Sequence, residues 1–190
     1  MKTPLIIGLT GKAGAGKDTV SEIICSAHQF AAIGFADPIR RMIFELFCIA
    51  SIPNDHIFDR TKKEQIIPAL GVSYRHMAQD LGTKWGQELA PDFWIKIAEK
   101  RILERRKHRN FQRFCISDVR FPREAAWVRS KGGVIWQIDR PGIAPVRAHV
   151  SEQLIDQITP DQTIINDGSV DDLRLKVTAL AEQLLDQNHG

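Results

Sequence analysis

Three glycines and a lysine near the start of the sequence have the spacing of a phosphate-binding loop. Residues 5–19 read LIIGLTGKAGAGKDT, so an apolar run leads into the glycines, and a helical pattern follows from Lys17 to about His28. Glycines let successive backbone N–H groups turn toward a polyphosphate, because side chains there would block its approach. The positive end of the helix dipole faces the same anion, and Lys17 is expected to reach the β- and γ-phosphates. The expected phosphate-binding residues are Gly11, Ala13, Gly14, Ala15, Gly16 and Lys17.

The residue after this lysine departs from the usual loop pattern. Asp18 stands where a Ser or Thr hydroxyl usually meets Mg²⁺, and Thr19 follows it. A carboxylate beside a triphosphate is repulsive unless a cation lies between them. Either Asp18 helps to hold the metal, directly or through water, or Thr19 takes the hydroxyl role. A third interpretation makes Asp18 a solvated first-turn residue that the helix dipole favours.

A second group of charged residues follows the apolar run FQRFCIS at 111–117. Asp118 ends this run, and Arg120 and Arg123 come directly after it. An aspartate at the end of a strand, paired with a phosphate loop, can hold Mg²⁺ or orient an attacking oxygen. Arginines bind phosphate bidentately, which positions it without covalent chemistry. The alternative is that Asp118 caps the next helix and both arginines are solvated.

Three further strand ends carry candidate residues. Asp37 and Arg40 open a helix after the second strand, where they either serve helix geometry or face an acceptor phosphate. Arg140, with Arg147 and His149 beyond it, lies on a proline-bearing loop that could close over a transferring phosphoryl group. Asn166 and Gly168 form a turn whose backbone could bind a purine edge, although a plain turn would look the same.

Alternating strands and helices must position these residues. Strands are expected at 4–10, 31–35, 111–117, 134–139 and 162–166, with helices at 17–28, 123–130, 151–157 and 170–187. The stretch from 38 to 108 is expected to be mostly helical, including TKKEQIIPAL at 61–70. This order predicts an α/β fold with a five-stranded parallel sheet covered by helices on both faces. The candidate residues would gather beyond the carboxyl ends of its strands.

Length and composition fit one α/β domain over residues 1–190, with a helical arm at about 38–110 and a lid-like loop at about 140–150. The net charge of +3 gives no case for nucleic acid as the main partner. The basic cluster between residues 101 and 113 is expected to be a solvated helix end. Three widely spaced cysteines indicate core positions in a reducing compartment, and no apolar run is long enough for a membrane span. We therefore expect a cytoplasmic protein.

The motifs, taken in order, resemble those of the deoxynucleoside monophosphate kinases of bacteriophages and prophage-bearing bacteria. The matching stretches are GLTGKAGAGKDT, GFADPIR, MAQDLGTKWGQ with DFWIK, ISDVRFPREA and INDGS, and the Gly-Lys-Asp ending of the loop is typical of that group. The resemblance implies a three-layer P-loop kinase fold and transfer of the ATP γ-phosphoryl group, with Mg²⁺, to a deoxynucleoside monophosphate. It also assigns acceptor contacts to residues whose aromatic members would otherwise be interpreted as core: Gln79, Gly82, Thr83, Trp85 and Trp94.

The resemblance also suggests a homodimer. Two alternatives to a deoxynucleoside monophosphate kinase remain open. One is a kinase of the same fold acting on another phosphorylated small molecule, such as phosphomevalonate. The other is a nucleotide-dependent binding or regulatory module. The sequence does not specify which deoxynucleotide bases are accepted.

Overall fold

The computed structural model describes residues 3–142 and 154–188, and its chain divides into two compact units. Unit 1 comprises Met1–Gly34 and Glu99–Gly190, and unit 2 comprises Phe35–Ala98. The second boundary falls inside helix α6 (Phe93–Arg109).

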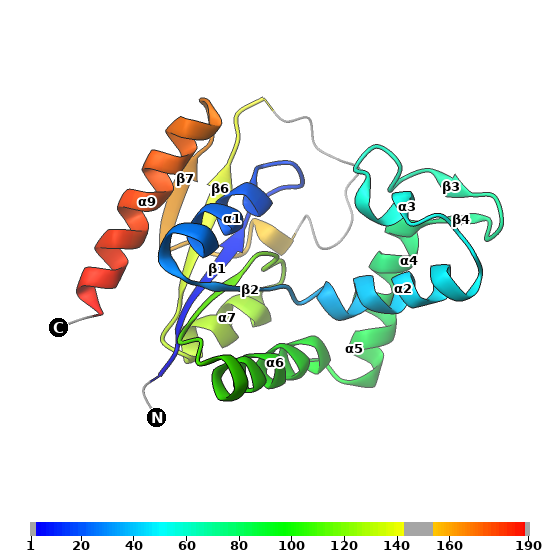
Figure 1. The fold of residues 1–190 in the computed structure, drawn as a ribbon, viewed down its shortest axis with the longest axis horizontal. Helices are drawn as coiled ribbons and strands as arrows, with labels where there is room; N and C mark the ends of the chain where they lie inside the picture. Colours follow the sequence, from blue (N-terminus) through cyan, green and yellow to red (C-terminus); the bar gives the residue numbers. More distant parts are fainter. Residues whose placement is uncertain (1–2, 143–153, 189–190) are drawn as a thin grey trace. The chain divides into compact units, whose positions relative to one another are not determined.

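Unit 1 is built on a five-stranded sheet in the order β2-β5-β1-β6-β7, and every pairing in it is parallel (Figure 1). The strands are β1 (Leu5–Thr10), β2 (Ala31–Ile33), β5 (Arg113–Ile116), β6 (Val134–Asp139) and β7 (Gln162–Ile165). The α/β prediction of a five-stranded parallel sheet is confirmed; β6 has the expected bounds, and the other four strands are slightly shorter than expected.

The residues of β1 alternate between the two faces of the sheet, because successive side chains of a strand point in opposite directions. Ile7 and Leu9 are fully buried in the cluster that α1 (Lys17–His28) and α9 (Val170–Gln187) cover. The opposite face packs against α7 (Pro122–Ser130), since a Cβ on Gly8 would lie in van der Waals contact with Val128, at 3.4 Å. Central strand β1 is thus buried on both faces and holds the loop that follows it.

The outer strand β2 has its free edge covered by arginines of α6. Ile33 O accepts a hydrogen bond from Ser117 N, so the alternate carbonyls of Ala32 and Gly34 point away from the sheet. Arg105 donates to Ala32 O at 2.8 Å, and Arg101 donates to Gly34 O at 3.0 Å. The expectation of a solvated basic helix end is therefore wrong for these two arginines, which satisfy an exposed strand edge.

Unit 2 is mainly helical, but part of its helical prediction is wrong. Its elements are α2 (Asp37–Ile49), α3 (Asp55–Phe58), β3 (Ile66–Ile67), β4 (Val72–Ser73), α4 (Tyr74–Asp80), the π-helical turn η1 (Leu81–Trp85), α5 (Gly86–Leu89) and the start of α6. Residues 61–70 form turns and the first strand of the β3–β4 hairpin instead of a helix. Pro68 cannot continue a helical ladder, and Gly71, with φ +69°, closes the hairpin.

Among the residues that the structure describes, no helix has the length and apolar character needed to cross a membrane. Cytoplasmic localisation and dimerisation stay predictions.

Candidate active site

The backbone between β1 and α1 forms a narrow cradle that has no room for side chains at two glycines. Gly11 has φ +135°, and a Cβ there would lie 2.3 Å from the carbonyl oxygen of Ile138. Gly16 has φ +105°, and its Cβ would lie 2.6 Å from Nδ2 of Asn166. The first and last glycines of the loop are therefore required both by backbone conformation and by space.

Helix α1 begins at the end of this loop, with the positive end of its dipole toward the loop. Gly16 is the N-cap residue and, as a glycine, supplies no side-chain cap hydrogen bond. The Lys17 ammonium lies over the loop and donates to Gly11 O at 2.5 Å and Lys12 O at 2.9 Å. N–H groups, helix dipole and ammonium together favour a bound polyanion.

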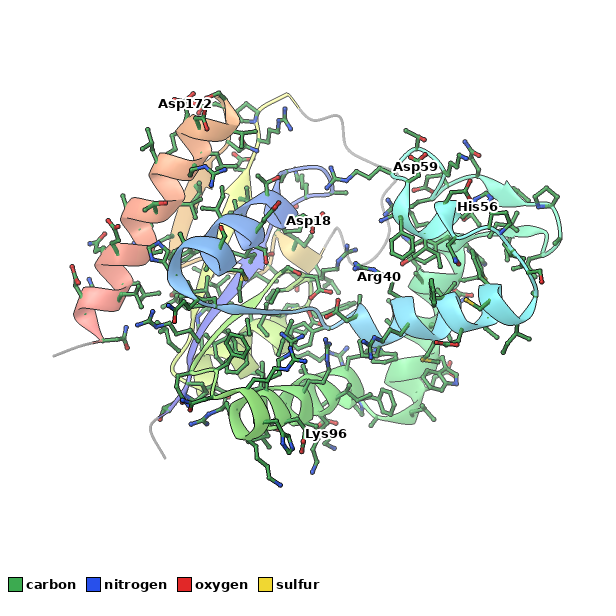
Figure 2. The ribbon with its side chains drawn as sticks, viewed as in Figure 1. Asp18, Arg40, His56, Asp59, Lys96 and Asp172 are labelled. Atoms are coloured by element: carbon green, nitrogen blue, oxygen red, sulfur yellow. The ribbon has the colours of Figure 1, made fainter. Side chains whose placement is uncertain are left out.

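The oxygen donors near this cradle suit Mg²⁺, a hard cation that prefers carboxylate, hydroxyl and phosphate oxygens. Asp18 is exposed in the first turn of α1, where Figure 2 labels it, and Thr19 is half-buried. Within residues 3–142 and 154–188, no three His, Cys, Asp or Glu side chains gather as ligands. Mg²⁺ bound with a nucleotide takes most of its ligands from phosphates and water, so one or two protein oxygens are enough. A metal contact by Asp18 or Thr19 stays a prediction.

Asp118 lies beside the end of β1, in the turn that follows β5. Val119 N donates to Leu9 O at 3.0 Å, which places this turn next to the entrance of the phosphate cradle. Helix α7 begins at Pro122 with Phe121 as its N-cap residue. Asp118 therefore does not cap the following helix, and that alternative is wrong.

A buried carboxyl group that our sequence prediction missed holds this turn. Oε2 of Glu124, which is 6% exposed, accepts hydrogen bonds from the N–H groups of Arg120 at 2.8 Å and Phe121 at 3.1 Å. Burial raises the pKa of Glu124 to about 8, and the nearby Asp118 charge also raises it, whereas the hydrogen bonds and the Arg120 charge lower it. A glutamate in the third position of a helix is a known capping signal, which could have indicated this role.

The arginines expected to bind phosphate lie on or near this turn and at the end of β6. The Arg123 guanidinium carbon lies 5.6 Å from the ring centre of Phe121, and Arg140 is exposed directly after β6. Arg147 and His149, most of the lid-like loop and the start of the helix expected at 151–157 lie outside the described residues. Phosphate contacts by Arg120, Arg123 and Arg140 stay predictions.

The turn after β7 is tied to the phosphate cradle. Asn166 donates from Nδ2 to Ala15 O at 2.8 Å, and its backbone N–H donates to Asp139 O at 2.7 Å. A Cβ on Gly168 would lie 2.7 Å from Oδ2 of Asp172, which reaches back to the cap of α9 (Figure 2). The backbone N–H of Asn166 is thus already engaged, and a purine contact by this turn stays a prediction.

In unit 2, the indole of Trp94 stabilises the π-helical turn η1. Trp94 is 8% exposed and donates from Nε1 to Gly82 O at 3.0 Å, while Thr83 donates to Gln79 O at 2.6 Å. Trp85 is 40% exposed, and its ring centre lies 6.0 Å from that of Trp94. The buried indole of Trp94 supports the π-helical turn through its hydrogen bond, whereas the indole of Trp85 is exposed to solvent. Single-turn π-helical segments are frequent at functional sites.

The remaining acceptor candidates of unit 2 lie in α2. Asp37 falls inside the first turn of this helix, since Ala36 is the N-cap residue, so it is not the cap. Arg40 is exposed one turn into α2, where Figure 2 labels it. Their contacts with an acceptor stay predictions.

Comparison with known proteins decides the family. The sequence model of the deoxynucleotide monophosphate kinase family matches residues 53–177. The chain belongs to this family. The match begins after the phosphate loop, so the family membership and the geometry of that loop are separate lines of support.

Individual proteins that are similar to this chain support the family assignment. A protein of Acanthamoeba polyphaga mimivirus, named "Putative deoxynucleotide monophosphate kinase", is 26% identical over 97% of this chain and 100% of its own length. Two solved structures share the fold. The TT1252 protein of Thermus thermophilus is 17% identical with a TM-score of 0.51, over 96% of this chain and 99% of its own. A "putative kinase" of Chloroflexus aurantiacus is 13% identical with a TM-score of 0.52, over 98% of both chains.

This kinase is therefore a phosphotransferase, as the sequence motifs predict. Family membership favours a deoxynucleotide acceptor over phosphomevalonate, and an enzyme over a regulatory module.

Proposed function

We propose that this protein transfers the γ-phosphoryl group of ATP, with Mg²⁺, to deoxynucleoside 5′-monophosphates and releases deoxynucleoside diphosphates. The observation that carries this proposal is the glycine-bearing loop at residues 11–16, which has no room for a side chain at Gly11 or Gly16 and leads directly into the start of α1, in a chain of this kinase family.

The donor side of the reaction uses the cradle and Lys17. Backbone N–H groups at the start of α1 bind the phosphates, and the ammonium leaves the Gly11 and Lys12 carbonyls to contact the β- and γ-phosphates. Asp118, with Asp18 or Thr19, would hold Mg²⁺, whose chemistry is to neutralise charge on the phosphate oxygens. Phosphoryl transfer needs mainly alignment and charge compensation, so no protein nucleophile is required.

The acceptor side uses arginines, which suit phosphate because their guanidinium groups bind it bidentately. Arg120 and Arg123 would hold the acceptor phosphate, with Arg40, and Arg140 would neutralise charge that develops during transfer. In unit 2 the exposed face of Trp85 is suited to stacking against a base, and Trp94 keeps it in place. The remaining proposed acceptor residues are Asp37, Gln79, Gly82 and Thr83.

The test is a product assay with each deoxynucleoside monophosphate supplied separately with ATP and Mg²⁺. We expect equal amounts of ADP and deoxynucleoside diphosphate from at least one acceptor. Lys17→Ala should lower kcat by about 10²-fold or more, because one preorganised charge on the transferring group is lost. Lys107→Ala removes an exposed lysine of α6 and is the matched control. ADP without diphosphate, or ATP binding without turnover of any acceptor, would contradict the proposal.

A further inference from the structure

The side chain of Asn166 joins the last strand of the sheet to the phosphate cradle. Its Nδ2 donates to Ala15 O at 2.8 Å, across 151 positions of sequence, and lies 2.6 Å from the place that a Cβ on Gly16 would occupy. The amide therefore packs directly against the Ala15–Gly16 peptide.

Hydrogen bonds hold the backbone at Asn166 and on either side of it. They fix the position from which the Asn166 side chain extends. Its backbone N–H donates to Asp139 O at the end of β6. Lys176 of α9 donates to Ile165 O at 2.8 Å and to Asp167 at 2.7 Å. These bonds secure the residues on either side of Asn166.

The geometry of one peptide bond links this contact to phosphate binding. In a trans peptide the C=O and the following N–H point in opposite directions. Holding Ala15 O on Asn166 therefore aims the Gly16 N–H away from Asn166. Lys17 must give up its own bonds to the loop when it turns to a phosphate, but the Asn166 bond does not involve the lysine and can remain.

We propose that Asn166 is a positioning residue for the donor phosphates, which fixes the Ala15–Gly16 peptide so that the Gly16 N–H faces the bound anion. This inference rests on the proposed phosphate-binding role of the loop. An amide is suited to the task because it donates to a carbonyl oxygen, whereas a carboxylate of the same shape would repel it.

The test compares Asn166→Asp and Asn166→Ala with Asn188→Asp. Asn188 donates from Nδ2 to Leu184 O at 2.8 Å near the end of α9, so its variant removes a bond of the same kind far along the helix from the cradle. Dissociation constants would be measured for ATP and for inorganic tripolyphosphate, together with KM for the deoxynucleoside monophosphate and the melting temperature.

We expect Asn166→Ala to weaken ATP and tripolyphosphate alike by about 2- to 10-fold, and Asn166→Asp to weaken both more strongly. KM for the acceptor and the affinities of Asn188→Asp should stay near those of the unaltered protein. Because tripolyphosphate has no base, loss of ATP affinity alone would show a base contact and overturn the proposal. Unchanged affinity for both ligands in Asn166→Ala would also overturn it. The affinities for ATP and tripolyphosphate are measured without the acceptor. A protein that phosphorylates no deoxynucleotide would therefore refute the proposed function, whereas these two affinities would still decide the role of Asn166.

Discussion

The buried carboxyl group of Glu124 predicts an unusual pH dependence of stability. Its pKa is raised from 4.5 to about 8 in the folded protein, mainly by burial. Between these values the folded state keeps a proton that the unfolded state has lost. The unfolded chain therefore binds fewer protons, and the free energy of unfolding falls as the pH rises from about 4.5 to about 8.

The size of this effect follows from the shift. At about 1.4 kcal/mol per pH unit, a shift of roughly 3.5 units corresponds to at most about 5 kcal/mol. That is a large part of the roughly 5–15 kcal/mol that stabilises a typical domain. Glu124→Gln keeps an oxygen that can accept from Arg120 N and Phe121 N but cannot ionise. We expect this variant to be more stable than the unaltered protein above pH 8, by a few kcal/mol, and to lose the advantage near pH 5.

The assay is urea unfolding followed by tryptophan fluorescence at intervals from pH 5 to pH 9. The thiols of Cys25 and Cys115 also have shifted pKa values, through their mutual hydrogen bond and burial, but they are present in both proteins and cancel in the difference. Glu182→Gln, which removes a carboxylate from an exposed position of α9, is the matched control. Parallel profiles for Glu124→Gln and the unaltered protein would refute the reasoning.

Three further substitutions test other parts of unit 1. Thr10→Val replaces a fully buried hydroxyl that has no hydrogen-bond partner among residues 3–142 and 154–188, so the free energy of unfolding in urea should rise by about 1 kcal/mol; a fall would mean that the hydroxyl has a partner. Gly16→Ala puts a Cβ against Asn166 at a positive φ, and chemical denaturation should show a loss of about 2 kcal/mol or more, with weaker ATP binding; an unaffected variant would contradict the cradle geometry. Arg105→Ala frees the Ala32 carbonyl at the sheet edge, so we expect about 1 kcal/mol less stability and faster aggregation by light scattering than in Arg109→Ala, and equal behaviour of the two would argue against edge protection.

The phosphate loop and the sheet are predictable from sequence because their signals are local. Apolar runs, glycine spacing and the helical pattern after Lys17 all lie within a few residues of the elements they specify. The hairpin at residues 66–73 is missed because charged residues before it favour a helix, and only Pro68 and Gly71 interrupt that pattern. Competing local signals of this kind are decided by the fold as a whole.

The supports of the candidate site are harder to predict, because they join residues far apart in the chain. The hydrogen bond between Asn166 and Ala15 depends on which strands become neighbours, and no local sequence pattern predicts it. The same holds for Arg105, which donates to a strand edge 73 positions earlier in the chain. Glu124 is an intermediate case, since its capping position is visible but its burial is not.

The position of β1 in the centre of the sheet has a consequence for the order in which the protein folds during synthesis. Its two neighbours come much later in the chain, since Leu5 pairs with Arg113 and Ile7 with Val134. At about 5–20 residues per second, a ribosome makes the first of these partners several seconds or more after β1. The phosphate loop, although translated early, therefore acquires its final shape among the last parts of unit 1, when β7 brings Asn166 to Ala15.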